Sequence, residues 1–596
     1  MNEGDHGPWN PGIRSVLPAE LRHLATLFRP ENSFTPYPTA VELSGLTGVP
    51  PSELVALRPE RLALHELLIR VTADFAVPDG STVGDLGINF REIVRLLLQR
   101  HLSPRMGEIT SAYDSVRCRV RACIDGAFAD ALQAASPAPM AVPARGLLAR
   151  WWGRPGTPAA STAVGGWGPA QIAACQDLAA GAEDEEARAA YRALARVMSA
   201  TYAAHGQAWG TRDLIVDVAT NLACNECGAD AIGRVIEPLL AEAARAGDQR
   251  LLPRQERPVV INTKGASASG KSTLRLLQKR LAREIGADWS DFALISPDIW
   301  RKQLLDYGSL GNAYKYAGSF TAEELQIVDQ KLDRYMAGKH RRGEMTHLLI
   351  DRFRFDSFAS DSDEAGSNLL TRFGQAVYLY FVIAPPESLV ERAWKRGLEF
   401  GRYKAVDDTL AHAVLAYGGM PDVFFTWVRR SDKRLHFEFL DNSVRLGERP
   451  RTIAFGDNQT LNVLDVGGTL DVERYGRINV DALAPGQLYR DRGLLDAARN
   501  TGFLRRCVQG FRTVNFARQQ TGQVYLRMES GVPVAVDRVL LAAAVEDPDT
   551  RSGLEAVAPA GLRGEVAEAA EPLTLTRTGD APALGEWGHG DAGGRS

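Results

Sequence analysis

The sequence has few cysteines, no long apolar run and almost no net charge. Its six cysteines in 596 residues are irregularly spaced, which argues for reduced thiols rather than a disulfide framework. No apolar run reaches the roughly 18–20 residues of a membrane span, and the N-terminus lacks the basic-then-apolar order of a secretory signal. A net charge of −4 offers no general attraction for nucleic acid or an anionic membrane. These absences predict a soluble protein, cytoplasmic where it is made, with neither nucleic acid nor membrane as a partner.

Metal-binding patterns are also scarce. Cys224 and Cys227 form one pair with metal-ligand spacing, but no second Cys or His pair completes four ligands nearby. A zincin motif beginning at His65 and Glu66 would need histidine at position 69, where Ile69 stands. Buried thiols are therefore favoured over a zinc or redox site.

What the sequence does contain is a phosphate-loop pattern, GASASGKST, at 265–273. A β-branched run at 259–263 precedes it and leucines at helical spacing follow it, which is the strand, loop and helix context that the pattern needs. The lysine is expected to lie along the β- and γ-phosphates of ATP, and the first hydroxyl after it to take one Mg²⁺ position. The expected ATP-binding residues are Gly265, Ser269, Gly270, Lys271, Ser272 and Thr273.

Around this loop, short apolar strands alternate with helices, which predicts an α/β fold: a P-loop kinase core with a five-stranded parallel sheet, preceded by mostly helical N-terminal regions. The expected strands are 259–263, 292–296, 346–351, 377–383 and 434–440. The expected segments are a flexible leader (1–40), a helical domain (41–134), an Ala/Pro/Gly-rich linker (135–168), a helical segment packing on the kinase core (169–255), the P-loop kinase domain (256–470), a mixed or helical extension (471–545) and a disordered tail (546–596). A capping box from Thr321 to Glu324 predicts a helix that ends at Gly338. The linker predicts that residues 1 to about 165 are not needed for phosphoryl transfer.

Carboxylates and arginines follow two of the predicted strands, where α/β enzymes collect their chemistry. Asp298 is the expected catalytic base; the alternative is a helix N-cap. Asp351 is expected to hold Mg²⁺ through water, and Arg352 and Arg354 to hold an anionic acceptor, with a structural Asp–Arg pair as the alternative.

A basic helix after the fourth strand is a candidate lid. Arg392 and Arg396 are four residues apart and share a face, and Arg402 follows shortly after, so these guanidinium groups are expected to clamp the transferring phosphoryl group. A solvated charged face is the alternative. Tyr314 is a candidate for stacking on a flat substrate ring, although aromatic residues more often pack in cores. No guanine-reading segment is found, so a small-molecule kinase fits better than a GTPase.

Seven segments together resemble one known family. They are GASASGKST, ISPDIWRKQLLDYGSLG, YKYAG, HLLIDRFRFDSF, ERAWKRG, GRYKAVDD and HFEFLDNS, within about 250–530. They look like the zeta-toxin-related type III effectors of plant-pathogenic bacteria, the Avr-Rxo type. The resemblance implies a phosphate-loop kinase that transfers the ATP γ-phosphate to the 3′-hydroxyl of the adenosine ribose of NAD. It also implies secretion into host cells by a type III system and a small cognate antitoxin or chaperone protein. Lys271, Ser272 and Thr273 match the family's ATP loop, and Asp298 matches its catalytic carboxylate.

Three other functions stay open. The acceptor can be a UDP-N-acetyl amino sugar, as in zeta toxins proper, or a polynucleotide 5′ end, which the acidic pI of about 6.3 disfavours. The third is a non-catalytic effector that binds host proteins through its helical N-terminal half.

Overall fold

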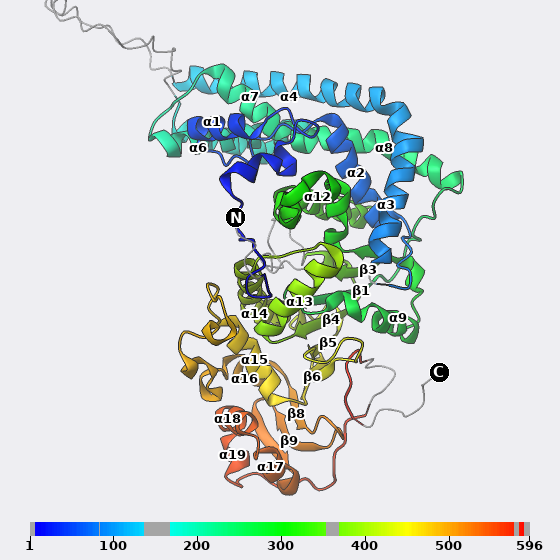
Figure 1. Ribbon diagram of the computed structural model, residues 1–596, viewed down its shortest axis with the longest axis vertical. Coiled ribbons are helices and arrows are strands. Elements are labelled where there is room, and N and C mark those ends of the chain that lie inside the picture. The colour runs from blue at the N-terminus through cyan, green and yellow to red at the C-terminus, as the bar shows by residue number, and fades with distance from the viewer. Residues whose placement is uncertain (1–5, 83, 136–166, 353–368, 577–582, 589–596) are drawn as a thin grey trace, which may run out of the picture. The chain divides into compact units, whose positions relative to one another are not determined.

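The structure, a computed structural model, is α/β and falls into two compact units. The described residues are 6–82, 84–135, 167–352, 369–576 and 583–588. Unit 1 comprises Met1–Leu17, Ile69–Ile93 and Gln249–Ser596, and unit 2 comprises Pro18–Leu68 and Val94–Asp248. Figure 1 labels their helices and strands.

Unit 2 is helical in its described residues. Its helices are α1 (Tyr37–Thr47), most of α2 (Pro59–Asp74), the end of α3 (Asp85–Leu97), α4 (Met106–Ala135), α5 (Pro169–Gly181), α6 (Glu185–His205), α7 (Arg212–Ala223) and α8 (Ala229–Arg245). Helix α6 shows why such segments are helical: the Asp184 carboxylate accepts a hydrogen bond from the Ala187 amide, and Gly206 ends the helix with φ 68°. Leu194 and Val197 bury its apolar face.

The predicted flexible leader is packed in its described residues, 6–40. Two short helical turns, Ala19–Leu24 and Thr26–Phe28, lie in it, and Leu27 is buried. The Phe28 ring packs edge-on against Tyr37 at 5.1 Å between centroids. The polar composition of the segment suggested flexibility, but a few buried apolar side chains are enough to hold it in place. Most of the predicted linker, 136–166, lies outside the described residues.

Unit 1 is built on one ten-stranded mixed sheet in the order β10-β9-β8-β7-β6-β5-β4-β1-β3-β2 (Figure 1). The strands are β1 (Val259–Gly265), β2 (Phe292–Ile295), β3 (His347–Asp351), β4 (Ala376–Ile383), β5 (Arg434–Asp441), β6 (Arg451–Asp457), β7 (Thr460–Val463), β8 (Thr513–Ala517), β9 (Val524–Glu529) and β10 (Val532–Val536). All five predicted strands are present as β1 to β5, and they pair in parallel with their neighbours among themselves. The predicted sheet of five strands has too few strands. Strand β6 pairs antiparallel with β5, and the sheet continues from there to β10.

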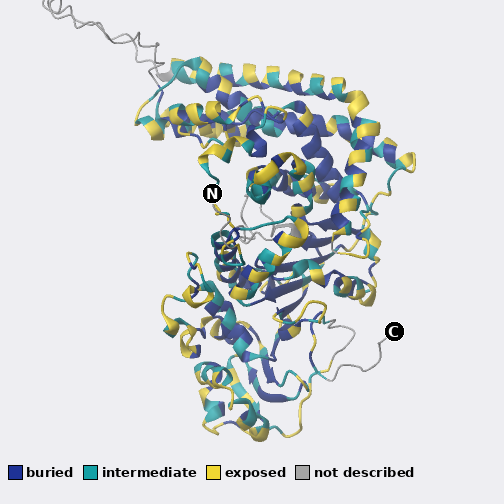
Figure 2. Cartoon of the chain, in the orientation of Figure 1, coloured by how far each residue is buried: buried dark blue, intermediate teal, exposed yellow. Residues whose placement is uncertain are grey.

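Alternating side chains of the strands face different helices of unit 1. The helices are the start of α3, α9 (Arg275–Glu284), α10 (Arg301–Leu304), α11 (Ala317–Phe320), α12 (Ala322–Arg341), α13 (Pro386–Phe400), α14 (Val406–Val428), α15 (Val466–Gly476), α16 (Gly502–Gly510), α17 (Arg538–Ala544), α18 (Pro548–Val557) and α19 (Pro559–Leu562). Ile261 and Val382 share a buried cluster with Leu281 of α9, whereas the ring of Phe381 packs against Phe424 of α14. Strands β1 to β5 are accordingly buried on both faces along most of their length, as their dark blue colour in Figure 2 shows. None of the helices within the described residues is long and apolar enough to cross a membrane.

The predicted disordered tail is ordered in its described parts. Helices α18 and α19 lie in it, and Trp587 stacks on Phe455 of β6 with ring centroids 4.6 Å apart. The amides of Leu584 and Gly585 donate to the buried Glu438 carboxylate of β5 at 2.7 and 2.9 Å. The composition of the tail did not predict these contacts, because their partners lie more than a hundred residues away along the chain.

The predicted capping box at Thr321 does not form. A short helix, α11, runs directly into α12, so Thr321 has helical φ and ψ angles instead of the extended conformation of an N-cap. Its hydroxyl donates to the Ala317 carbonyl and accepts from Arg301 at 2.7 Å. Helix α12 also continues past Gly338 to Arg341.

The segment Ile69–Ile93 belongs to the same compact unit as the loop 265–273. Asp74 accepts hydrogen bonds from Tyr335 and from the Lys339 ammonium, both on α12, and Thr72 accepts one from the Trp300 indole at 3.1 Å. These partners are buried or half-buried, so losing them leaves unpaired polar groups in the core. The segment is therefore part of the folded unit and not a dispensable appendage.

A truncated chain beginning near residue 170 is therefore expected to lose phosphoryl transfer through misfolding, contrary to the expectation from the sequence. The measurement is ATP turnover together with the midpoint of thermal unfolding. A chain lacking only residues 1–5 is the control and should keep both. A truncated chain that unfolds cooperatively with undiminished turnover would contradict this expectation.

Candidate active site

The loop between β1 and α9 has a backbone that only small residues permit. Gly270 has φ +95°, and a Cβ there would clash with the Asn442 side-chain amide. A Cβ on Gly265 would lie 2.7 Å from the Val382 carbonyl oxygen of β4. The Asn442 amide also donates to the Ser269 carbonyl at 2.7 Å. The residues that follow β5 thus hold the loop in place.

Inside this loop the Lys271 ammonium donates to the carbonyl oxygens of Gly265 and Ala266, both at 3.1 Å. Burial lowers the pKa of Lys271, while the charges of Asp351 and Asp298 oppose that shift. Among the described residues, the amides of Ala268 and Gly270 donate to no backbone carbonyl outside a helix or strand. A lysine and backbone amides around one turn are the groups that bind anions in such concavities.

Ser272 and Asp351 meet at the carboxyl ends of β1 and β3. The Ser272 hydroxyl donates to the Asp351 carboxylate at 3.1 Å, and Arg275 lies 3.9 Å from the same oxygen. Thr273 donates instead to the Gly270 carbonyl at 2.6 Å and so supports the loop. Hydroxyl and carboxylate oxygens are suitable Mg²⁺ ligands. No cluster of three or more His, Cys, Asp or Glu suited to a metal is found in the described part of the chain.

Asp298 lies in the turn Pro297–Trp300 that follows β2, and it caps no helix. Its carboxylate accepts a hydrogen bond from Arg301 at 2.9 Å and lies 3.6 Å from Arg402, with 55% of the side chain exposed. Burial raises the pKa of Asp298, but Arg301 and Arg402 outweigh it and lower the pKa well below its ordinary value. Asp298 is therefore an ionised, accessible carboxylate.

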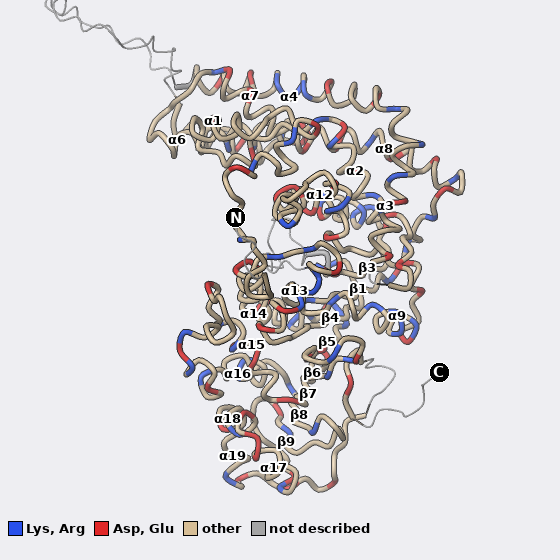
Figure 3. The backbone as a smooth tube through the Cα atoms, in the orientation of Figure 1, with Lys and Arg blue, Asp and Glu red and all other residues tan. Residues whose placement is uncertain are grey.

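The two arginines predicted to share a face of helix α13 have different surroundings. Arg392 donates to the carbonyls of Asn442 and Val444, at 2.7 and 3.3 Å, and so fixes the residues after β5. Arg396 is near Asp298; burial and the charge of Arg402 lower its pKa to about 10, and its Nε is buried without a partner in the described residues. Lys and Arg positions along α13 are marked in Figure 3. The structure thus brings Arg396 and Arg402 to Asp298, but not Arg392.

Of the arginines after β3, Arg352 is 2% exposed and donates to Asp329 of α12, so it forms a structural ion pair away from solvent. Arg354 lies outside the described residues. Tyr314 is half-buried and packs edge-on against Tyr403, with centroids 5.8 Å apart.

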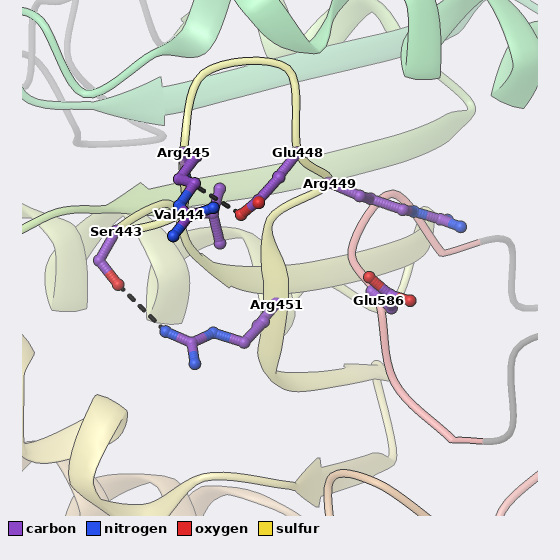
Figure 4. Close-up of a pocket in the computed structure, with 7 residues that line it drawn as sticks. All are labelled: Ser443, Val444, Arg445, Glu448, Arg449, Arg451 and Glu586. Atoms are coloured by element: carbon purple, nitrogen blue, oxygen red, sulfur yellow. Dashed lines mark hydrogen bonds between the residues drawn. The ribbon is translucent and has the colours of Figure 1, made fainter.

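A pocket of about 440 Å³ opens beside the loop that follows β5 (Figure 4). Its lining residues are Ser443, Val444, Arg445, Glu448, Arg449, Arg451 and Glu586. The Arg445 amide donates to Glu448 at 3.1 Å, and Arg451 donates to Ser443 at 3.1 Å. The first lining residue, Ser443, directly follows Asn442, whose side-chain amide donates to the Ser269 carbonyl.

Sequence reasoning missed four charged or polar residues around Asp298: Arg301, Lys404, Asp408 and His412. The spacing of Asp298 to Arg301 and of Lys404 to Asp408, at i,i+3 and i,i+4, was the available signal. Comparison with family models, with curated proteins and with solved structures finds no match to this chain.

Proposed function

We propose that this chain is an ATP-dependent phosphotransferase that phosphorylates the 3′-hydroxyl of the adenosine ribose of NAD. The observation that carries the proposal is the placing of Lys271 in a glycine-constrained loop after β1, of Ser272 on Asp351 at 3.1 Å, and of Asp298 within 3.6 Å of Arg402. Phosphoryl transfer needs a cation that binds the phosphates, a carboxylate that orients the acceptor hydroxyl, and a guanidinium group that neutralises the moving phosphoryl group.

The topology supports the same proposal. Strands β2, β3, β1, β4 and β5 are consecutive and parallel, so the residues after β1, β2 and β3 lie at one edge of the sheet. Ligands of open α/β sheets bind at that edge. The parallel part of the sheet matches what a P-loop kinase core requires.

Binding of ATP would use groups that now bond to the chain itself. The Lys271 ammonium can exchange the carbonyls of Gly265 and Ala266 for phosphate oxygens, which are stronger, charged acceptors. Ser272 and Asp351 would hold Mg²⁺, which neutralises charge on the phosphates when bound. The nucleoside would extend toward the pocket of Figure 4, where Arg445 can lie against a flat base.

The transfer itself forms a bond between the acceptor oxygen and Pγ and breaks the bond between Pγ and the β,γ-bridging oxygen, releasing ADP. Asp298 accepts a hydrogen bond from the acceptor hydroxyl, orients it and receives its proton. Arg396 and Arg402 lie beside Asp298, where they can neutralise the equatorial oxygens of the moving group.

The identity of the acceptor is proposed from the resemblance of the sequence segments. Tyr403 follows Arg402, which lies 3.6 Å from Asp298, and its ring packs edge-on against Tyr314; two such rings suit a nucleotide acceptor with a flat base. UDP-N-acetyl amino sugars carry a base and a diphosphate as well, so the same features admit them.

The test is mass spectrometry of NAD, NADH, adenosine and UDP-N-acetylglucosamine after incubation with the enzyme and Mg-ATP. We expect NAD to gain one phosphate and the product to resist enzymes that require a 2′-phosphate. Transfer to the UDP-sugar alone would replace NAD as the acceptor, and no transfer to any of the four would overturn the proposed activity.

A further inference from the structure

Helix α3 brings a cation from the N-terminal part of the chain to the turn that holds Asp298. A Cβ placed on Gly87 of α3 would lie 3.2 Å from Arg91 Nη1 and 3.9 Å from a methyl carbon of Ile299, the residue after Asp298. The Arg91 guanidinium and the Ile299 side chain are therefore close neighbours. Leu86 of α3 is buried in the core cluster of the sheet, against which Ile299 also packs, so the helix is held next to this turn.

The start of α3 is fixed as well. The Asp85 carboxylate accepts hydrogen bonds from the amides of Ser81 and Thr82, both at 2.8 Å. The Asn89 amide donates to the Pro78 carbonyl at 2.9 Å. A carboxylate that bonds free amides at a helix start keeps the first turn from fraying. The arginine that follows on this helix thus extends from a well-ordered backbone.

A second cation, Lys302 of α10, stands four residues after Asp298. Its ammonium lies 5.6 Å from the centroid of the Tyr307 ring. Burial lowers the pKa of Lys302, and the charges of Arg91 and Arg402 lower it further, so these three cations are near enough to repel one another. Lys302 is exposed and Arg91 is half-buried, so a ligand in solution can reach both.

The three cations differ in their partners. Arg402 lies 3.6 Å from the Asp298 carboxylate. Within the described residues, neither Arg91 nor Lys302 takes part in a hydrogen bond or an ion pair. Burial lowers the pKa of Arg91, and the charge of Glu92 opposes that shift without an ion pair to it. Cations held together in this way repel one another in the free protein, and a bound anion relieves the repulsion.

The triphosphate of ATP is not the anion that this place suits. The loop 265–273 follows β1 and contains Lys271, whereas Lys302 and Asp298 follow β2. The order β1-β3-β2 puts β2 two strands from β1, which is about 10 Å across a sheet. Asp298 is the residue proposed to bind the acceptor hydroxyl. Arg91 and Lys302 therefore belong to the acceptor's side of the site.

Resting on the proposed kinase function, we propose that Arg91 and Lys302 are specificity-determining residues that bind a phosphate of the acceptor. A guanidinium can donate two parallel hydrogen bonds to phosphate oxygens, and an ammonium adds a compact positive charge. NAD and UDP-N-acetyl amino sugars both carry a diphosphate that supplies this ligand, whereas a neutral nucleoside does not. Helix α3, which lies outside the segments that resemble known effectors, thereby gains a direct role in substrate binding.

The test measures acceptor binding by calorimetry. The ATP site is first filled with a non-hydrolysable ATP analogue, so that an added diphosphate cannot occupy the loop around Lys271. NAD and UDP-N-acetylglucosamine are compared on the wild type, each beside its neutral nucleoside, adenosine or uridine, and the tighter nucleotide is used for the variants. We expect Arg91→Gln and Lys302→Gln each to weaken its binding by roughly 10-fold, as expected for losing one charge-assisted hydrogen bond. Binding of the nucleoside and of the ATP analogue should not change, and Arg91→Lys should recover part of the loss.

Arg283→Gln is the matched control, because it removes the same charge from an exposed arginine in the last turn of α9, the end of that helix farther from the loop 265–273. It should change none of these affinities. An equal loss for nucleotide and nucleoside would show a purely structural role and overturn the proposal. So would an undiminished affinity for the nucleotide, or a wild type that binds neither nucleotide. A loss of affinity for the ATP analogue would assign the two cations to the ATP site and overturn the proposal as well.

Product formation separates this proposal from the kinase function on which it rests. If the variants lose nucleotide affinity selectively but the wild type phosphorylates no acceptor, the kinase function fails and the phosphate-binding role stands. If the wild type and both variants phosphorylate NAD and adenosine at equal rates, the kinase function stands and the role of Arg91 and Lys302 fails.

A measurement on the wild type alone gives an independent check if Arg91→Gln does not fold. With the ATP analogue bound, inorganic pyrophosphate should compete with the acceptor nucleotide and leave binding of the nucleoside unchanged, because only the nucleotide uses Arg91 and Lys302. Nucleotide binding that is insensitive to pyrophosphate would contradict the proposal.

Discussion

Replacing Asp298 by asparagine is expected to lower kcat by roughly 10²- to 10⁴-fold, the usual span for losing a general base, while ATP affinity holds. The asparagine oxygen can still accept the 2.9 Å hydrogen bond from Arg301, so the local geometry should survive. What is lost is the negative charge that orients the acceptor hydroxyl and takes its proton. The measurement is phosphorylated NAD formed per unit time at equal ATP occupancy.

The low pKa of Asp298 refines this expectation. Arg301 and Arg402 keep the carboxylate ionised, so it is a weak base that acts by orienting the hydroxyl until the proton is released late in the transfer. Asp422→Asn is the control, because it neutralises an aspartate on α14 that is 67% exposed and away from the loop. A near-wild-type rate for Asp298→Asn, with the control also unchanged, would remove Asp298 from the mechanism.

Replacing Lys271 by alanine is expected to lower kcat/KM for ATP by roughly 10²- to 10³-fold, as removal of one preorganised donor commonly does. Nucleotide binding and turnover should fall together, because the ammonium contacts the phosphates in the ground state and in the transition state. Calorimetry with a non-hydrolysable ATP analogue measures the first, and product formation measures the second.

Stability distinguishes this effect from misfolding. Folding lowers the pKa of Lys271, so the folded state disfavours the charged form at pH 7, and the alanine variant should unfold at the same temperature or higher. Lys395→Ala is the matched control and should leave nucleotide binding unchanged. Normal ATP binding by Lys271→Ala would refute the assignment of the phosphate loop.

The positions of β1 to β5 were predictable because each is a short segment rich in apolar residues, as expected for strands buried on both faces. The extension through β6 to β10 was not predictable in the same way. Strand β7 has only four residues, and β10 exposes Val532. Neither strand therefore gives a strong pattern of hydrophobic residues in the sequence. The sequence also did not predict that the tail is ordered in its described parts, because the residues that hold it, such as Glu438, are distant along the chain.

Within the site, the sequence alone determined the glycine-rich loop 265–273 after β1, since Gly265 and Gly270 are tied to one backbone geometry by local sterics. It also determined that Asp298 follows directly after a strand. The tertiary structure decided the surroundings of the arginines: their spacing on α13 could not reveal that Arg392 donates to carbonyls after β5 while the charge of Asp298 acts on Arg396. The physical reason is the distance along the chain over which each effect acts. Local spacing places side chains on one face of a helix, but which face meets charge, solvent or backbone depends on strands and helices that the chain brings together only on folding.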